Sequence, residues 1–548
     1  MGEGNRKSNE GRVNVSRFLD TMARDQGCVP ALMVPRGRTG NGDIDYLTLS
    51  FSELSEEQDL WAARLQAAGI GRGSRTLLMV KPGLPLIAIC FALFKIGAVP
   101  IVIDPGMGLK SFLSCVRRSR PEYLVGITLA AVVSRVFFKT FSSVRARVRV
   151  GGPLARAPRL VESKGIEAAD TRSDDLAAVL FTSGSTGAPK GVCYEHGMFE
   201  GQVEAIRDRF SIEPGEVDLP MLPIFALFNP ALGMTTVVPE INPSKPATVD
   251  PEKIVQAIRQ CGVTNSFGSP VLWKKIGVYC EKESIRLPSL KRILMAGAPV
   301  PPELMRLYRS ILGEGHVYSP YGATEVLPVS AISDVEVIEE TAELTARGKG
   351  TCVGTPAPGV EIRILSHTIE GASFSDAVPQ GGVGEIVVTG PTVTKEYDQL
   401  PDATAKAKIL ADDGRVWHRM GDLGYLDEVG RLWFCGRKVE RVLTETREYF
   451  TDCCEGVFNG HSDVFRTALV GYSGSNGVFP AIVVEPMDGR MPQSEGEKQS
   501  FTKSLREMAR GIDGAEDIEN FFYYGPFPVD VRHNAKIHRL DLAAMILK

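Results

Sequence analysis

The feature that most restricts the fold is the repeated pairing of a helix with a short apolar strand in the N-terminal half of the chain. For example, the helical pattern of Ser52–Ala68 precedes the apolar strand Thr76–Val80. Parallel strands need a crossover connection, which is usually a helix. This pattern predicts an α/β fold with a large body of parallel or mixed sheets covered by helices. Later strands, at Val360–Leu365 and Glu385–Thr389, alternate around a Gly/Pro-rich loop and predict a small antiparallel or β-barrel-like unit.

The pattern changes again after Gly436. Alternating strands at Leu469–Tyr472 and Ala481–Val484, followed by an amphipathic helix near residues 501–511, predict a smaller α+β unit. We therefore predict two domains, a large N-terminal domain and a C-terminal domain of normal size, comprising residues 1–436 and 437–548.

Composition excludes some classes of function. The chain has 548 residues, with 62 Lys and Arg against 66 Asp and Glu, so the net charge of −4 gives no general reason to bind nucleic acid. Hydrophobic residues make up 43% of the chain, which is enough for a large core. The ten cysteines are scattered without a Cys-x-x-Cys pair, and Met1–Asn14 shows no apolar segment typical of a secretory signal. Together these features predict reduced thiols and a cytoplasmic location.

One apolar stretch, Leu84–Ile103, is long enough to span a bilayer. However, Lys95 lies inside it, and Pro85 and Pro100 interrupt a continuous helix. The stretch therefore predicts a buried helix that ends near Gly97 and is followed by a buried strand, so we expect no transmembrane segment.

The segment from Val132 to Val150 is basic and contains no acidic residue. A basic amphipathic helix of this kind is typical of a peripheral contact with an anionic membrane or of a docking site for a partner. The alternative is a solvated surface helix that leads into the alternating strand Val144–Val150. The basic residues are Arg135, Lys139, Arg145, Arg147 and Arg149, and the aromatic residues among them are Phe137, Phe138 and Phe141.

A loop of small residues follows the apolar stretch Leu176–Phe181 and predicts a phosphate site. Glycines let backbone N–H groups approach a phosphate, while hydroxyl groups and a lysine add donors and positive charge. The spacing is not that of a Walker loop. The predicted phosphate-binding residues are Thr182, Ser183, Gly184, Ser185, Thr186, Gly187 and Lys190.

The segment Thr182–Gly191 resembles the phosphate loop of the acyl-adenylate-forming superfamily of AMP-dependent synthetases and ligases. Further segments similar to motifs of this superfamily occur in its order over nearly the whole chain. This resemblance implies ATP as a substrate, Mg²⁺ as a cofactor and a mobile C-terminal domain. The segments are Ala296–Pro299, Tyr321–Glu325, Gly384–Gly390, His418–Gly424, Gly436–Arg437 and Pro528–Ile537.

The resemblance also implies a role for each matching residue. Tyr321 would stack on adenine, Thr324 would contact the α-phosphate, and Glu325 would hold Mg²⁺. Asp422 would bind the ribose hydroxyls, and Lys536 would place a positive charge between the attacking carboxylate and the α-phosphate. Because this attack brings two anions together, catalysis is mostly positioning and charge neutralisation. The implied catalytic residues are Lys536, Glu325 and Thr324, and the further nucleotide-binding residues are Gly297, Ala298, Pro299, Tyr321, Gly322, Ala323, Asp422 and Arg437.

The chain departs from the superfamily pattern at three places. Ala226 stands where many relatives carry His, between Phe225 and Phe228, which either line an apolar acyl pocket or belong to the ordinary core. The hinge motif lacks the Asp expected two places after its Gly-Arg pair. We assign the hinge to Lys438, with Glu440 as the alternative. The lysine motif reads Asn-Ala-Lys instead of the common Ser-Gly-Lys.

These departures are similar to those of the β-lactone synthetases of bacterial olefin biosynthesis. The resemblance implies adenylation of a long-chain 2-alkyl-3-hydroxyalkanoic acid, followed by attack of its own 3-hydroxyl to give a β-lactone, without CoA. It also points to assembly with other olefin-pathway enzymes. The alternatives are a ligase that makes acyl-CoA and a non-catalytic nucleotide-binding scaffold. The phrases that carry this resemblance are Leu93–Pro100, Val217–Pro220, Phe225–Phe228 and Asp530–Lys536.

Overall fold

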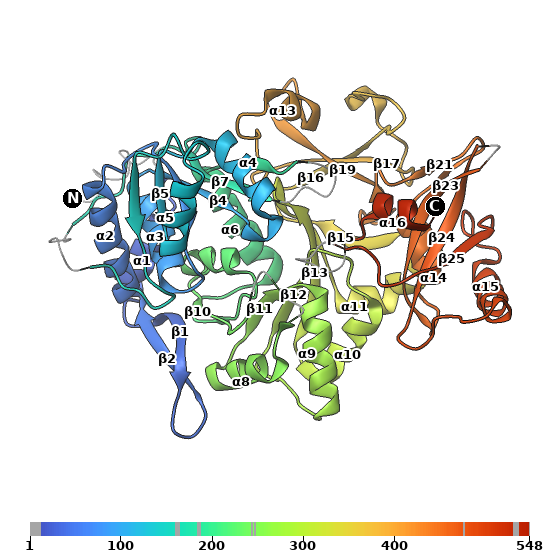
Figure 1. The fold of residues 1–548 in the computed structure, drawn as a ribbon, viewed down its shortest axis with the longest axis horizontal. Coiled ribbons are helices and arrows are strands. Elements are labelled where there is room, and N and C mark those ends of the chain that lie inside the picture. Colours follow the sequence, from blue (N-terminus) through green and yellow to red (C-terminus); the bar gives the residue numbers. More distant parts are fainter. Residues whose placement is uncertain are drawn as a thin grey trace.

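The computed structural model describes residues 13–158, 165–182, 188–242, 245, 248–474, 477–529 and 536–546. Its fold is α/β, with a large body of two sheets and a smaller α+β unit at the C-terminal end (Figure 1). Within the described residues, no helix combines the length and the apolar character needed to cross a membrane.

A six-stranded sheet forms the N-terminal part of the body, in the order β6-β5-β3-β4-β7-β8. Its neighbouring strands are parallel except for the antiparallel pair β7 and β8. The strands are β3 (Arg75–Met79), β4 (Val99–Ile103), β5 (Tyr123–Gly126), β6 (Ala146–Arg149), β7 (Leu176–Thr182) and β8 (Lys190–Glu195). The helices of this part are α1 (Arg17–Asp25), α2 (Phe51–Ala67), α3 (Leu84–Lys95), α4 (Leu109–Ser119) and α5 (Thr128–Val136).

Helix α3 and strand β4 confirm the prediction of a buried helix followed by a buried strand. The helix ends before Gly97, whose φ of +69° suits glycine. Lys95 is buried inside the apolar helix, where its Nζ lies 3.1 Å from Asp20 and 2.6 Å from Asp59. These two carboxylates provide the charge partners that a buried ammonium group needs.

The second sheet has fourteen strands and runs through the rest of the body. Its central strands β13, β12, β11, β9, β10 and β1 are parallel neighbours, as the sequence predicts. The strands of this half are β1 (Pro30–Arg38), β2 (Ile44–Ser50), β9 (Val217–Asp218), β10 (Thr235–Val237), β11 (Asn265–Gly268), β12 (Arg292–Met295), β13 (His316–Ala323) and β14 (Val326–Ser333). The covering helices are α6 (His196–Phe210), α7 (Asn229–Leu232), α8 (Pro251–Cys261), α9 (Pro270–Lys282), α10 (Pro302–Leu312), α11 (Asp334–Glu336) and α12 (Ala342–Ala346), with the 3₁₀ helix η2 (Pro223–Leu227).

The predicted antiparallel strands pair with each other. Strand β15 pairs with β14 on one side and β20 on the other, so the antiparallel strands continue the large sheet. The predicted antiparallel pairing of these strands is confirmed, and the unit they form is joined to the large sheet through β15. The remaining elements of the body are β15 (Thr351–Pro356), β16 (Glu361–Leu365), β17 (Gly384–Thr389), α13 (Pro401–Ala407), β18 (Lys408–Leu410), β19 (Val416–Leu426) and β20 (Leu432–Arg437).

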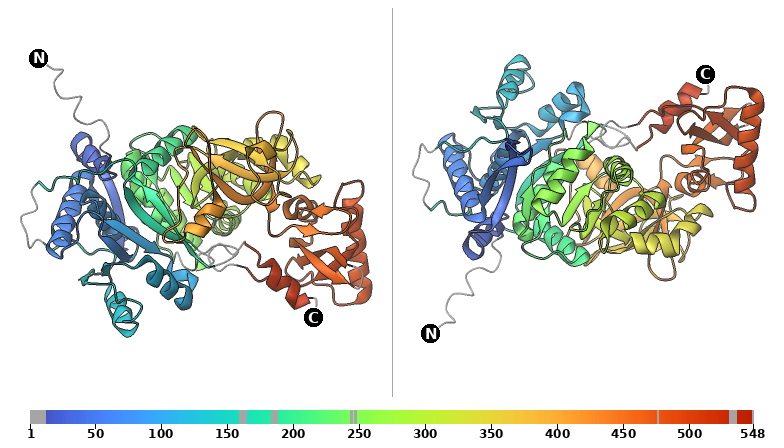
Figure 2. Two further views of the ribbon diagram at one scale, coloured as in Figure 1. Left: turned by 90° about the horizontal axis from the view of Figure 1, so that it is seen from above. Right: turned by 90° about the horizontal axis from the view of Figure 1, so that it is seen from below.

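The C-terminal unit has the predicted α+β character. Its amphipathic helix begins at Glu495, earlier than predicted, because the Ser494 side chain accepts a hydrogen bond from the Glu497 N–H and caps the first turn. The elements are β21 (Val442–Leu443), β22 (Glu448–Tyr449), α14 (Thr451–Phe458), β23 (Val464–Gly474), β24 (Gly477–Pro486), α15 (Glu495–Ala509), β25 (Asn520–Tyr523) and α16 (Arg539–Ile546). The unit lies at one end of the elongated molecule (Figure 2).

The basic segment contains a helix that leads into a strand, as one of the two readings predicts, but the helix begins and ends earlier in the chain. Helix α5 covers Thr128–Val136, and a turn region separates it from β6. The side chain of Phe141, which is 1% exposed, packs into the core beside the sheet. The backbone leaves the helical conformation before this residue so that its side chain can be buried. Most of the basic residues therefore lie on the turn and on β6, not on a helix.

Candidate active site

The predicted phosphate loop connects two paired strands of the six-stranded sheet. Thr182 at the end of β7 pairs with Lys190 at the start of β8. Ser183, Gly184, Ser185, Thr186 and Gly187 lie outside the described residues, so their phosphate-binding role stays a prediction. Lys190 is exposed, and its Nζ lies 4.6 Å from the centre of the Tyr397 ring. Tyr397 also donates a hydrogen bond to Glu325, so this contact places the Lys190 charge near Glu325.

A tight turn between β13 and β14 carries the predicted adenine and metal residues. Tyr321, Gly322 and Ala323 end β13, and Thr324 and Glu325 form the turn. A side chain at position 322 would place its Cβ 2.8 Å from the carbonyl oxygen of Val326, so the turn requires glycine there.

Two tyrosines from distant segments hold this turn. The Tyr194 hydroxyl donates to the Thr324 carbonyl oxygen at 2.5 Å, and the Tyr397 hydroxyl donates to Glu325 Oε1 at 2.7 Å. Burial raises the pKa of Tyr397, and the Glu325 charge raises it further, so this tyrosine remains a donor at neutral pH. The sequence motifs do not identify Tyr194 or Tyr397, because neither contact is local in the chain.

Lys408 is a third residue that sequence reasoning missed. Its Nζ donates to Thr394 Oγ1 at 3.1 Å. Burial lowers its pKa to about 8, while the Glu325 charge opposes that shift. The surroundings of Glu325 are therefore more positive than its motif alone indicates.

The residues described contain no cluster of three or more His, Cys, Asp or Glu side chains able to hold a metal ion. Mg²⁺ does not need such a cluster, because it is usually held by one or two carboxylates together with waters and substrate phosphates. Glu325 fits this mode, since Tyr397 occupies one of its oxygens and orients the carboxylate.

The predicted ribose residue, Asp422, lies on β19 directly opposite Arg437 on β20. The Tyr321 hydroxyl donates to Asp422 Oδ2 at 2.5 Å, and Arg437 Nε lies 3.1 Å from Oδ1. Among the described residues, Oδ1 accepts no hydrogen bond of good geometry although it is buried, so it can accept from a donor such as a ribose hydroxyl. The structure thus brings together three predicted residues from three motifs.

The electrostatics of Asp422 also place the predicted mobile lysine near the site. Burial raises the pKa of the Asp422 carboxyl, while the charges of Arg437 and Lys536 and the hydrogen bond from Tyr321 act in the opposite direction. Lys536 therefore lies close enough for its charge to reach the nucleotide residues. Lys536 itself is exposed, as expected for a lysine that approaches the site from the smaller unit.

The adenine-side turn follows β12. The Ala296 N–H donates to the Gly268 carbonyl oxygen at 3.2 Å, and Gly297 then adopts a φ of +97°. Only glycine adopts this backbone conformation readily, which explains its position in the motif. Ala298 and Pro299 complete the turn on the surface side, and Pro299 is exposed.

The two candidate hinge residues are anchored to different bodies. The Lys438 N–H donates to the Gly421 carbonyl oxygen at 3.0 Å, and its Nζ donates to Glu385 Oε2 at 2.9 Å, both in the large body. Glu440 instead accepts from Arg539 of α16 at 2.7 Å. Lys438 is therefore fixed to the large body, and the assignment of the hinge to it stays a prediction.

Phe225 and Phe228, the predicted acyl-pocket residues, both line a largely apolar pocket under the large sheet. Phe225 stacks on Phe267 with ring centres 3.8 Å apart, and Phe228 stacks on Phe199 at 4.9 Å. One side of this pocket is polar. There Asp218 accepts from Asn229 at 2.9 Å and from Asn265 at 2.6 Å, and burial raises the pKa of Asp218 to about 6.

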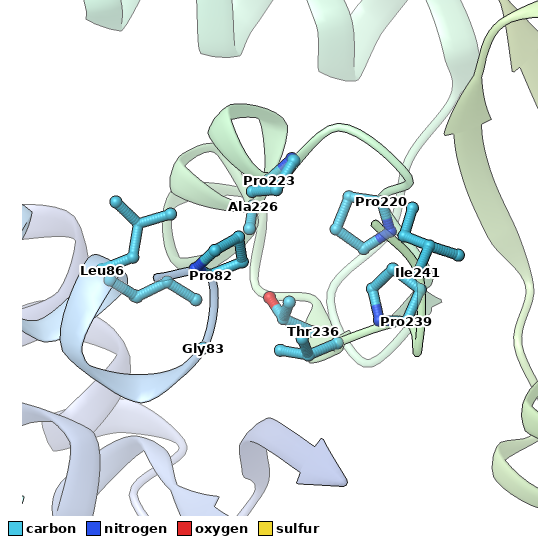
Figure 3. A pocket seen from close by; sticks show the side chains of 11 residues that line it. Pro82, Gly83, Leu86, Pro220, Pro223, Ala226, Thr236, Pro239 and Ile241 are labelled. Carbon is cyan, nitrogen blue, oxygen red and sulfur yellow. The ribbon is translucent and has the colours of Figure 1, made fainter. Parts of the chain in front are cut away.

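A second apolar pocket lies on the opposite face of the same segment. Pro223 and Ala226 line it together with Pro82, Leu86 and residues of the β10 region (Figure 3). Pro223 and Ala226 are three residues apart, so the helical segment turns both toward one side. Phe225 and Phe228 are also three residues apart, and together with Asn229 they face the other side. Because Pro223 and Ala226 are both apolar, the segment contributes no polar side chain to this second pocket.

Comparisons with known proteins show the family of the chain. Residues 33–398 match the family model described as AMP-binding enzyme. A relative from Xanthomonas campestris pv. campestris named olefin beta-lactone synthetase is 42% identical over 99% of both chains, and one of the same name from Stenotrophomonas maltophilia is 42% identical over 97% of both. The solved structure of an amide bond synthetase from Marinactinospora thermotolerans is 22% identical, covers 97% of this chain and 99% of its own, and has a TM-score of 0.78, which shows the shared fold.

Proposed function

Because the chain belongs to the AMP-binding enzyme family, we propose that it is an ATP-dependent ligase that closes a long-chain 2-alkyl-3-hydroxyalkanoic acid to a β-lactone. Two relatives with 42% identity carry the name olefin beta-lactone synthetase, which supports this reaction over other reactions of the family.

The observation that carries the choice of substrate is the pair of apolar pockets on opposite faces of the segment 223–229. A 2-alkyl-3-hydroxy acid has two hydrocarbon chains that diverge next to the carboxyl group. We infer that one chain occupies the pocket of Phe225 and Phe228 and that the other occupies the pocket of Ala226 and Pro223. A straight-chain acid would fill only one of them.

In the first step, a carboxylate oxygen of the acid attacks the α-phosphorus of ATP, the bond to the β,γ-phosphates breaks, and pyrophosphate leaves. Lys536 offsets the negative charge shared by the two reactants, and Asp422 orients the ribose. Thr324 would contact the reacting phosphate. Mg²⁺, held by Glu325 and the phosphates, supplies further charge neutralisation when bound.

In the second step, the 3-hydroxyl oxygen of the same acid attacks the carbonyl carbon of the acyl-adenylate. The new C–O bond closes the four-membered ring, the hydroxyl proton leaves to solvent or a nearby base, and AMP departs with the electrons of the broken C–O bond. Because the nucleophile is tethered to the electrophile, no thiol acceptor is needed.

The proposal includes the setting of the enzyme. All ten cysteines are free thiols, which supports a reducing compartment such as the cytoplasm. A β-lactone with two long chains is poorly soluble in water, so we propose that the product passes directly to other enzymes of an olefin pathway in an assembly.

The test is incubation of the full-length protein with ATP, Mg²⁺ and a racemic long-chain 2-alkyl-3-hydroxy acid, with and without CoA. We expect one AMP per acid consumed and a neutral product lighter than the acid by one water, both independent of CoA. The Lys536→Ala variant is the control for product formed without enzyme catalysis. A CoA thioester, or a strict requirement for CoA, would contradict the proposal and assign the protein to the acyl-CoA ligases.

A further inference from the structure

The segment from Pro105 to Val150 has a charge unlike that of the rest of the chain. It contains nine Lys and Arg residues and one acidic residue, Glu122, so its net charge is +8 in a chain of net charge −4. Among the described residues, Arg145 is the member of this group with an acidic partner, at 3.2 Å from Glu122. The nine residues are Lys110, Arg117, Arg118, Arg120, Arg135, Lys139, Arg145, Arg147 and Arg149.

The two helices of this segment lie on the same face of the six-stranded sheet. The chain moves in one direction across the sheet from β3 to β4 and in the other from β4 through β5 to β6. Because such crossovers are right-handed, α4 and α5 cover the face opposite to α3. Phe112 and Val116 of α4 and Ala130 of α5 share one core cluster. Both helices project from the same side of the body in Figure 2.

Helix α5 shows the reverse of the usual burial pattern. Its buried residues are small, namely Ala130, Ala131 and Ser134. Apart from Val133, which packs against the core, its large apolar side chains face outward. Leu129, Val132 and Val136 are 65%, 48% and 65% exposed at helical spacing, and Phe138 just beyond the helix is 64% exposed. Surface helices normally bury their large apolar residues against the core, so this outward stripe marks an interaction surface.

We propose that this α4–α5 face, defined by the nine basic residues and the apolar stripe of α5, docks on the surface of an anionic lipid bilayer. The cations would lie at the level of anionic headgroups, while the apolar stripe enters the boundary with the acyl chains. The basic residues and the apolar stripe both match an anionic bilayer. Because the face is positively charged, the strength of the contact should depend on the charge of the lipid headgroups. A lipid acid with two long chains would then reach the enzyme from the membrane. This supply of substrate rests on the proposed function, whereas the docking itself does not.

The test is sedimentation of the full-length protein with vesicles of phosphatidylcholine and phosphatidylglycerol at a 3:1 ratio, compared with vesicles of phosphatidylcholine alone. We expect binding to the anionic vesicles only, and release in 0.5 M NaCl, because exposed charges are screened. The variant Val132→Glu/Arg135→Glu should reduce partitioning by at least about tenfold. The matched control is Val278→Glu/Lys282→Glu on α9, which makes the same change in charge and should bind like the wild type.

All three proteins should adenylate a short, water-soluble 3-hydroxy acid at equal rates, which shows that the variants are folded. Equal binding to both vesicle types, or no binding to either, would overturn the proposal and leave the face as a docking site for an acidic protein. Unchanged binding of Val132→Glu/Arg135→Glu would overturn the assignment of this face. Loss of lactone formation by the wild type would contradict the proposed function without affecting these binding results.

Discussion

The contact between Tyr397 and Glu325 gives a sharp test of the site, because Tyr397→Phe removes one oxygen atom and keeps the ring. The hydroxyl donates to Glu325 Oε1 at 2.7 Å, and Tyr397 is 5% exposed. A hydrogen bond to an ionised group contributes about 1.5–3 kcal/mol, which corresponds to roughly 10- to 150-fold in an equilibrium or rate constant. Glu325 is half-buried, so water replaces part of the lost bond, and we expect the low end, about tenfold.

The assay is acid-dependent exchange of pyrophosphate into ATP as a function of MgATP concentration. We expect kcat/KM for MgATP to fall about tenfold, because the carboxylate that orients the metal loses its own support. Affinity for AMP, which is measured without metal by calorimetry, should stay unchanged. The phenyl ring that Tyr397→Phe leaves in place would still contact Lys190, so that contact does not contribute to the difference.

The matched control is Tyr425→Phe, whose hydroxyl donates to the Lys349 carbonyl oxygen at 3.0 Å away from the nucleotide residues. This variant should retain wild-type exchange. Two results would refute the reasoning, namely an unchanged kcat/KM for Tyr397→Phe, or an equal loss of affinity for AMP. The second result would show that Tyr397 supports the whole turn and not the metal carboxylate.

Three other changes test separate parts of the molecule. Lys536→Ala should nearly abolish acyl-AMP formation while ATP affinity, measured by calorimetry, changes little; exchange at a near wild-type rate would remove Lys536 from the catalytic residues. Ala226→Phe should fill the second pocket and lower kcat/KM for a 2-alkyl acid by more than about tenfold relative to an acid without the 2-alkyl chain; an equal loss for both acids would contradict the two-pocket assignment. His196 is 1% exposed, its Nδ1 accepts from the Val15 N–H at 3.2 Å, and burial lowers its pKa to about 4. As pH falls, the unfolded chain therefore binds a proton at this histidine before the folded protein does. The free energy of unfolding should fall by about 3 kcal/mol between pH 6.5 and 4. The variant His196→Gln should flatten this part of the pH profile, measured by denaturant unfolding.

The sequence predicts the site best where each residue lies in a motif of its own. Asp422 and Tyr321 are 101 positions apart, yet their motifs place both on the nucleotide, and the structure joins them by a hydrogen bond. Tyr397 escapes prediction because its role depends on a contact 72 positions away, which no local pattern encodes.

Element types were also more predictable than their limits and their connections. Hydrophobic periodicity identifies α3 and β4 correctly, since both are buried on all sides. The same reasoning extends the basic helix too far, because burial of the Phe141 side chain overrides helix propensity. Likewise, strand alternation predicts antiparallel pairing of β16 and β17 but not their continuity with the large sheet, which depends on the distant pairing of β14 with β15.

The separate anchoring of Lys438 and Glu440 has a mechanical consequence. Between them lies only Val439, which is 67% exposed. The two backbone dihedrals of Val439 can rotate without breaking either ion pair, whereas rotation one residue earlier would detach Lys438 from Glu385. Two hydrogen bonds cross Val439, from the Glu440 N–H to the Arg437 carbonyl oxygen and from the Arg441 guanidinium to the Lys438 carbonyl oxygen, so a turn at this residue would break both. A cycle that turned the smaller unit in order to transfer its acyl group to a thiol would break them once per turnover, whereas ring closure within one bound acid would not.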